Sequence, residues 1–410
     1  RPNGYKKWRK NPKMVVFGDS AGDSGRRFNA PPSFDFEGIG AFPWRKLYSA
    51  NDTEEKFRAY LPSPGAVTNG KAWPDWLRVP EELNFATSSA SMTATYRSGS
   101  TCLGYTGEGE DFPTGTLNEQ IDRYFNDIVY STNETLGYTH IITLGANDMA
   151  NFLEAVYRYQ VGQVLQTQGA FGGNAYEDPV AFDKVFEIVN GTSEINAEPL
   201  ITEVVTELST GIQRLLAIGV TGRILVGNVP SFKGMQDLVL SGVADTIDQL
   251  ALATNAAVEQ LVNTNPQLRL LDLYTLFAAI ADNTQIFESL GFSGPENATE
   301  DLPVPLGTPC LQIQFAVDYI SEIMGTQDLR AASCQEECAL CADSVSPCQN
   351  CYAGNPSATV CDDPDSRIFW DSRHPSTAAH LLLGEAARLC SKDKPNYNRP
   401  FVQILCPDVE

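Results

Sequence analysis

Short apolar runs alternate with longer stretches of helical periodicity along most of the chain. Five of these runs are short enough to be buried strands, and they cover residues 14–17, 83–87, 140–144, 223–227 and 268–273. Strands that alternate with helices assemble into a parallel sheet with helices on both faces. The pattern therefore predicts an α/β fold.

Two stretches between these strands have the spacing of amphipathic helices. From Leu200 to Leu216, apolar residues recur every three or four positions, and Gly219 follows as the expected C-terminal stop. Residues 244–262 form the second predicted helix, ahead of the fifth strand. Both helices therefore connect neighbouring strands of the predicted sheet.

Two regions do not follow this alternation. Residues 160–197 are rich in glycine, glutamine and asparagine, and residues 307–364 contain most of the cysteines. Long excursions in a compact domain are usually lids, binding loops or stapled subdomains. We therefore expect a single domain over residues 14–410 with two insertions, preceded by a basic arm over residues 1–13.

The formal net charge of −22 limits the classes of partner. A strongly acidic protein repels nucleic acid and anionic lipid, so neutral or uncharged substrates are favoured. The basic arm is an exception to this charge balance, and we interpret it as a solvated tail. No apolar stretch approaches the roughly 18 residues of a membrane span. We therefore expect neither nucleic-acid binding nor membrane insertion.

The ten cysteines indicate an oxidising compartment, because a reducing one discourages such a number. The paired spacings between Cys334 and Cys361 also suit a zinc site, but disulfides are favoured in this context. Their connectivity stays open at this point. The bridges can also involve the four cysteines outside this cluster, Cys102, Cys310, Cys390 and Cys406.

Four Asn-x-Ser/Thr sequons point in the same direction as the cysteines, since such sites are glycosylated in the secretory route. They lie at Asn51, Asn133, Asn190 and Asn297. We therefore expect a secreted, extracellular glycoprotein.

A candidate nucleophile follows the first predicted strand, in the tripeptide Gly18-Asp19-Ser20. Attack on an acyl carbon needs a hydroxyl at an exposed turn, an imidazole that takes its proton, and a carboxylate that holds the imidazole in the right tautomer. The late segment over residues 369–375 contains Asp371 and His374. Together with Ser20, these two residues supply the three groups of a serine hydrolase.

The choice of the base is narrow because the chain contains three histidines. His140 opens an apolar run that is interpreted as a buried strand, and His380 lies in an apolar stretch where local packing is expected. His374 alone has a carboxylate one turn before it. It is therefore the candidate general base.

Residues 18–22 also match G-x-S-x-G, the nucleophile elbow of α/β-hydrolases. In that fold an earlier strand supplies the oxyanion loop, and the elbow lies well inside the domain. Only 17 residues precede Gly18, which is too few to build those elements. The elbow interpretation is therefore rejected.

Six segments, in order, make the chain resemble the GDSL, or SGNH, hydrolase superfamily. Phe17-Gly18-Asp19-Ser20 looks like the first block of that family, and Gly145-Ala146-Asn147-Asp148 matches the third. The other similar segments are residues 68–73, 84–90, 227–230 and 369–375. The resemblance therefore spans almost the whole chain.

The resemblance implies a catalytic triad in which Ser20 is the nucleophile, His374 is the general base and Asp371 orients the histidine. It also implies an oxyanion hole made by the Ser20 backbone N–H, the Asn147 amide and a backbone N–H at Ser89. Ser88 and Ser89 stand where the family usually has Gly-Gly. A backbone N–H survives this change where positive φ is not required, so the position keeps its donor.

The same resemblance implies a three-layer α/β/α sandwich with a flavodoxin-like, five-stranded parallel sheet and the site at the carboxyl edge of the strands. No cofactor or metal is implied. We expect an ester hydrolase that acts through an acyl-enzyme on short-chain acyl or phenolic esters, as small molecules or on polysaccharide. The alternatives are a lipase or phospholipase, an acyltransferase with the same triad, a non-catalytic binding module, and a zinc-stabilised interaction domain in the cysteine cluster.

Overall fold

The computed structural model describes the segments that form the core of the molecule. These are residues 13–24, 68–87, 90–95, 115–150, 152, 197–236, 239, 244–282, 284–289, 292–293, 305–314, 357–370, 374–392 and 406. The basic arm except Lys13, the first predicted insertion except residue 197, and most of the cysteine-rich region lie outside these residues.

A parallel sheet of four strands forms the centre. The strands are ordered β1-β2-β3-β4 and comprise Met14–Gly18, Thr139–Thr143, Ile224–Gly227 and Leu268–Leu271. Every residue of β1, β3 and β4 is buried. Strands that are covered on both faces are continuous apolar runs, which is the pattern that predicted them.

The second predicted strand, residues 83–87, lies beside β1 but does not form a regular strand. The backbone N–H of Phe85 donates to Val16 at 2.8 Å, and that of Thr87 donates to Gly18 at 3.0 Å. The backbone N–H of Gly18, which a regular ladder would direct at this segment, donates to the side chain of Gln120. Within the described residues, the parallel sheet therefore contains four strands, whereas five were expected.

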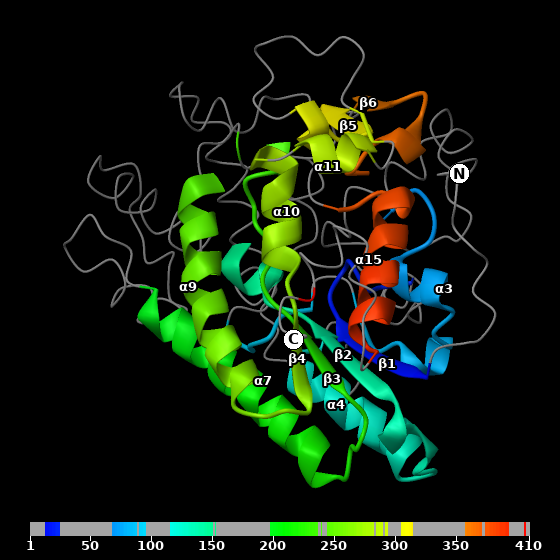
Figure 1. The fold of residues 1–410 in the computed structure, drawn as a ribbon, viewed down its shortest axis with the longest axis vertical. Coiled ribbons are helices and arrows are strands. Elements are labelled where there is room, and N and C mark those ends of the chain that lie inside the picture. Colours follow the sequence, from blue (N-terminus) through cyan, green and yellow to red (C-terminus); the bar gives the residue numbers. More distant parts are fainter. Residues whose placement is uncertain are drawn as a thin grey trace, which may run out of the picture.

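Helices cover both faces of this sheet, which gives three layers (Figure 1). On one side, α3 and α15 pack against each other, and α4, α7 and α9 form the layer on the other side. Their bounds are Trp73–Leu77, Thr377–Cys390, Leu117–Tyr124, Glu198–Ala217 and Ala244–Asn263. The three-layer α/β/α sandwich is thus the observed architecture.

The two predicted helices agree with α7 and α9 to within two residues at each end. Gly219 has a φ of +97° immediately beyond the end of α7, a conformation that favours glycine after a helix C-terminus. The remaining elements are α10 (Leu273–Asp282), α11 (Thr284–Ser289), η2 (Glu81–Leu83), η3 (Phe125–Val129), η4 (Glu134–Gly137), η5 (Pro305–Gly307) and η6 (Pro364–Ser366).

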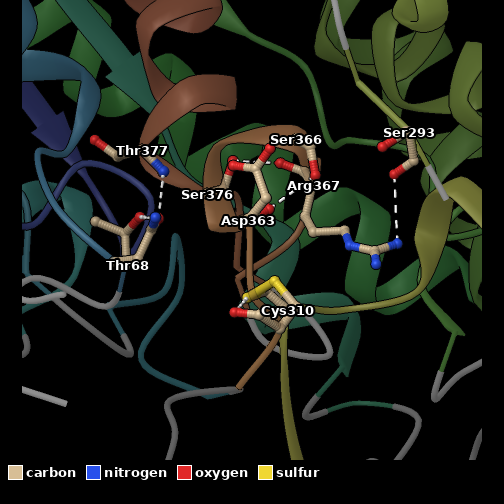
Figure 2. Close-up of a disulfide and its surroundings, with 10 residues drawn as sticks. Thr68, Ser293, Cys310, Asp363, Ser366, Arg367, Ser376 and Thr377 are labelled. Carbon is tan, nitrogen blue, oxygen red and sulfur yellow. Dashed lines mark hydrogen bonds between the residues drawn. A yellow bond between two sulfur atoms is a disulfide. The ribbon is translucent and has the colours of Figure 1, made fainter. Parts of the chain in front are cut away.

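A small antiparallel pair of strands joins the two ends of the cysteine-rich region. β5 (Leu311–Gln314) pairs with β6 (Ser357–Val360), and a disulfide connects Cys310 to Cys361 at the end of this pair. Figure 2 shows this disulfide near the turn where Ser366 bonds to Asp363. Cys361 is therefore a disulfide partner and not a zinc ligand.

A second disulfide joins Cys390, the last residue of α15, to Cys406. Arg269 on β4 donates to the carbonyl of Cys390 at 2.7 Å and to that of Lys392 at 2.6 Å. A cationic side chain at this position satisfies carbonyls that lack a helical partner. The end of α15 is thus held against the sheet.

Across the described segments, no helix is both long and apolar enough to cross a membrane.

Candidate active site

The site lies where parallel strands end, so that loops from distant parts of the chain meet at one edge. Ser20 follows β1, and Asn147 follows β2. Because all strands are parallel, their carboxyl ends share this edge, which is the usual ligand-binding side of such sheets. The geometry of each loop is built by buried polar side chains.

Residues 19–22, named here the nucleophile loop because they contain the candidate nucleophile Ser20, form a tight turn. The N–H of Gly22 donates to the carbonyl of Asp19 at 3.0 Å, and the N–H of Ala21 donates to the Asp19 carboxylate at 3.1 Å. Asn84 donates from its side-chain amide to the carbonyl of Gly22 at 3.0 Å. Ser20 lies at the tip of this turn and is partly exposed. The turn thus presents a hydroxyl toward solvent on a fixed backbone.

The structure brings Ser20 and His374 together. The Nε2 atom of His374 lies 2.9 Å from the Oγ atom of Ser20, although 354 positions separate the two residues. In this geometry Nε2 accepts the serine proton if the ring carries its own proton on Nδ1. This pair is the arrangement that a general base and its nucleophile require. Asp371, the third residue of the expected triad, lies outside the described residues.

The His374 segment is folded back on itself by backbone bonds. The N–H of Trp370 donates to the His374 carbonyl at 2.8 Å, and the N–H of Ser376 donates to the Ile368 carbonyl at 2.8 Å. Ser376 also caps α15, because its hydroxyl accepts the N–H of Ala379. His374 therefore lies two residues before the N-cap of α15.

The segment at residues 68–76 anchors this histidine loop from outside. Thr68 donates to the carbonyl of Pro375 at 3.0 Å, and Asn69 accepts the N–H of Thr377 at 2.7 Å. The indole N–H of Trp76 donates to the carbonyl of Thr377 at 3.1 Å. These bonds explain why the Thr-Asn-Gly segment, singled out in the sequence, matters for the site.

Asn147 is held at the start of the segment that follows β2. Its side-chain amide donates to the carbonyl of Ala90 at 2.7 Å, and the N–H of Ala90 donates to the carbonyl of Thr87 at 3.0 Å. An amide nitrogen has two hydrogens, so Asn147 keeps one for another acceptor. Ser88 and Ser89, the pair between Thr87 and Ala90, lie outside the described residues.

Asp148, the residue after Asn147, binds the backbone of residues 92–93, shortly after Ser88 and Ser89. Its carboxylate accepts the N–H of Met92 at 2.7 Å, and the N–H and hydroxyl of Thr93 at 2.9 Å each. Burial raises the pKa of Asp148 to about 7, and the three hydrogen bonds offset only part of this effect. Sequence reasoning included this residue in a family motif but gave it no task. The signal in the sequence was the position of this acidic residue, directly after Asn147, the candidate oxyanion-hole residue.

A second buried acid lies beside Ser20, the candidate nucleophile. Burial raises the pKa of Asp19 to about 6, although the Ala21 N–H and the charge of His374 favour its ionised form. Asp19 is buried and its side chain bonds to its own turn. The site therefore contains a carboxyl group that titrates close to neutral pH.

The other two histidines are structural. His140 is fully buried on β2, where its ring bonds to the Tyr138 carbonyl and to the Tyr124 hydroxyl, each at 3.0 Å. Burial lowers the pKa of His140 to about 4, so the ring is neutral under ordinary conditions. His380 is buried in α15. Both side chains lie in the interior of the fold.

Loops after β3 are fixed by α9, and sequence reasoning did not anticipate this. The side chain of Asn255 forms two hydrogen bonds of 2.8 Å with the backbone N–H and carbonyl of Val229. A Cβ atom on Gly145, which has a φ of +117°, would lie 3.1 Å from the Val229 side chain. Asn255 therefore fixes the backbone of Val229, whose side chain packs against Gly145 in the turn that leads to Asn147.

Across the segments that the structure describes, no group of three or more histidine, cysteine, aspartate or glutamate side chains is arranged to hold a metal ion. Of the four sequons, Asn133 is described and is exposed before η4, whereas the other three lie outside the described residues.

A three-layer sandwich with a serine and a histidine in contact at the carboxyl edge of its parallel sheet is typical of a serine hydrolase. The family model of the GDSL-like Lipase/Acylhydrolase family matches residues 14–387. The chain belongs to this family and is an esterase- or lipase-type hydrolase. No curated protein matches the chain.

Proposed function

We propose that this hydrolase is a secreted carboxylic-ester hydrolase in which Ser20 is the nucleophile, His374 the general base and Asp371 the group that orients His374. The observation that carries the proposal is the 2.9 Å contact between the Ser20 hydroxyl and Nε2 of His374. The two residues lie on separate loops that are 354 positions apart in the chain, and both loops must adopt specific conformations to bring the side chains into contact. The contact therefore supports a common role more strongly than the presence of the two residue types in the sequence does.

The reaction has two steps. Ser20 attacks the ester carbonyl while His374 takes its proton, and His374 then protonates the leaving alcohol, which leaves an acyl-enzyme. Water replaces the alcohol and attacks the acyl carbon while His374 takes its proton; His374 then returns this proton to the Ser20 oxygen as the acyl–oxygen bond breaks and the acid leaves. Asp371 stabilises the imidazolium that forms in each step. No other reactant is required.

The negative oxygen that develops on the ester needs fixed donors. We assign this task to the Ser20 backbone N–H, the Asn147 amide and the Ser89 backbone N–H. The bond from Asn147 to Ala90 supports the assignment, because it fixes the orientation of the amide and leaves its second hydrogen available.

For the substrate we propose short-chain acyl or phenolic esters of carbohydrates, including polysaccharide. The net charge of −22 favours neutral substrates over anionic lipid surfaces. The disulfides Cys310–Cys361 and Cys390–Cys406 are compatible with secretion, and we propose glycosylation at Asn51, Asn133, Asn190 and Asn297.

A panel of p-nitrophenyl esters of increasing chain length, assayed beside acetylated xylo-oligosaccharides, tests both the activity and the substrate. We expect the highest kcat/KM on acetyl esters and release of acetate from the oligosaccharides. A preference for long acyl chains would favour a lipase. Equal activity of the wild type and Ser20→Ala would refute the role of Ser20.

A further inference from the structure

The side chain of Gln120, a residue of α4, forms hydrogen bonds with the backbone of Gly18, immediately before the nucleophile loop, that a neighbouring strand would otherwise form. Its side chain is fully buried, and its Oε1 atom accepts the backbone N–H of Gly18 at 2.9 Å. Its Nε2 atom donates to the carbonyl of the same Gly18 at 3.0 Å. The second hydrogen of Nε2 is directed at the carbonyl of Gly115 at 3.3 Å. All the polar atoms of this amide are therefore used.

These bonds explain where β1 stops. In a regular parallel ladder the Gly18 N–H would donate to the carbonyl of Phe85 on the neighbouring segment. That carbonyl instead accepts the hydroxyl of Thr87 at 3.2 Å, and the Thr87 N–H alone reaches Gly18, at 3.0 Å. The amide of Gln120 takes the place of a peptide group at the end of the strand. The chain is then free to turn at the next residue, Asp19.

We infer that Gln120 is a positioning residue for Ser20. The two peptide groups between Gly18 and Ser20 determine the direction of the Ser20 N–H and of its side chain. A side chain that holds both polar groups of the Gly18 backbone leaves the start of the turn little freedom. The inference rests on the proposed role of Ser20 as nucleophile.

The alternative is that Gln120 only stabilises the packing of α4 on the sheet. Tyr124 on the same helix provides a matched control, because it is also buried and bonds to His140 and Thr135, away from the nucleophile loop. Tyr124→Phe removes these bonds and keeps the ring. Loss of packing alone would make the two positions behave alike.

The test compares Gln120→Met, Gln120→Glu and Tyr124→Phe with the wild type. Two rates are measured per folded molecule: kcat with p-nitrophenyl acetate, and inactivation by a fluorophosphonate that labels serine nucleophiles. For Gln120→Met we expect both rates to fall about 10- to 100-fold with KM changed less than about threefold. Tyr124→Phe should lower the melting temperature without changing either rate.

Gln120→Glu gives a second readout if the Met variant does not fold. In this variant an ionised carboxylate still accepts the Gly18 N–H, but its second oxygen faces the carbonyls of Gly18 and Gly115 and cannot donate to them. A protonated carboxyl group has an O–H that can donate to one of these carbonyls. The ratio of the variant rate to the wild-type rate should therefore rise as the pH falls, and taking the ratio removes the titration that both proteins share.

Unchanged rates in Gln120→Met, or a pH-independent ratio in Gln120→Glu, would overturn the inference. Ser20→Ala is labelled in parallel. If the wild type is not labelled at Ser20, the proposed function fails. If the wild type is labelled and the Gln120 variants are labelled equally fast, the positioning role alone fails.

Discussion

The hydroxyl of Ser20 and the Nε2 atom of His374 are 2.9 Å apart at the carboxyl edge of the sheet. Because the two groups act as a unit, Ser20→Ala and His374→Ala should each lower kcat by about 10³-fold or more, and the double variant should be no worse than the poorer single variant. The measurement is hydrolysis of p-nitrophenyl acetate. Ser131→Ala, which changes an exposed serine before β2, should keep full activity. Multiplying losses in the double variant would show that the residues act independently.

Two buried acids should make stability depend on pH. The pKa of Asp19 is raised to about 6 and that of Asp148 to about 7, whereas both titrate near 4 in the unfolded chain. Between these values the folded protein binds more protons than the unfolded chain. Their stabilising contribution is complete below about pH 4 and is lost as the pH rises to about 7. Each group changes the free energy of unfolding by at most about 1.4 kcal/mol per pH unit.

Asp148→Asn should flatten this dependence in urea denaturation measured from pH 4.5 to 7.5. Asp127→Asn, at an exposed position, should leave the slope as it is. The Asp148 variant should also lose about 10-fold in kcat, because its new NH₂ group faces a backbone N–H at Met92 or Thr93. An unchanged slope would mean that Asp148 is ionised throughout this range.

Gly18 should tolerate no side chain. A Cβ atom there would lie 2.8 Å from the Thr143 hydroxyl oxygen and 3.3 Å from the Ala86 Cβ. Gly18→Ala should therefore cost about 1–3 kcal/mol in the free energy of unfolding and lower kcat. Thr143→Ala removes the closest atom, so the double variant should regain part of both losses. Chemical denaturation and ester hydrolysis measure the two effects, and strict additivity would exclude this contact as the cause.

The Cys310–Cys361 disulfide should support the histidine loop. It closes a sequence separation of 51 residues, and the Cys310 N–H donates to the carbonyl of Phe369, five residues before His374. Replacing both cysteines with alanine should cost about 2–4 kcal/mol and should lower activity as well.

The Cys390–Cys406 bridge is the control, since its separation is 16 residues and it lies at the far end of α15. Removing it should lower the melting temperature with kcat retained. Calorimetry and ester hydrolysis on both double variants make the comparison. Equal activity in the two variants would show that the first disulfide does not position His374.

Local pattern was enough to identify much of this molecule. Continuous apolar runs located β1 to β4, because strands that are buried on both faces contain few polar residues. Apolar residues spaced by three or four positions located α7 and α9, because these helices are buried on one face. The sequence also predicted a strand at residues 83–87, and the structure places this segment beside β1. Its irregular backbone was not predicted, since it depends on a glutamine 102 positions after Gly18.

The sequence by itself determined the α/β class and restricted the candidate nucleophile and the candidate base, because chemistry limits which residue types can act and three histidines offered few choices. Tertiary structure alone decided that Ser20 meets His374, that Cys310 pairs with Cys361, and that Gln120, Asp148 and Asn255 hold the loops of the site. These contacts join positions far apart in the chain, and hydrogen-bonding partners at such separations leave no periodic signal in the sequence.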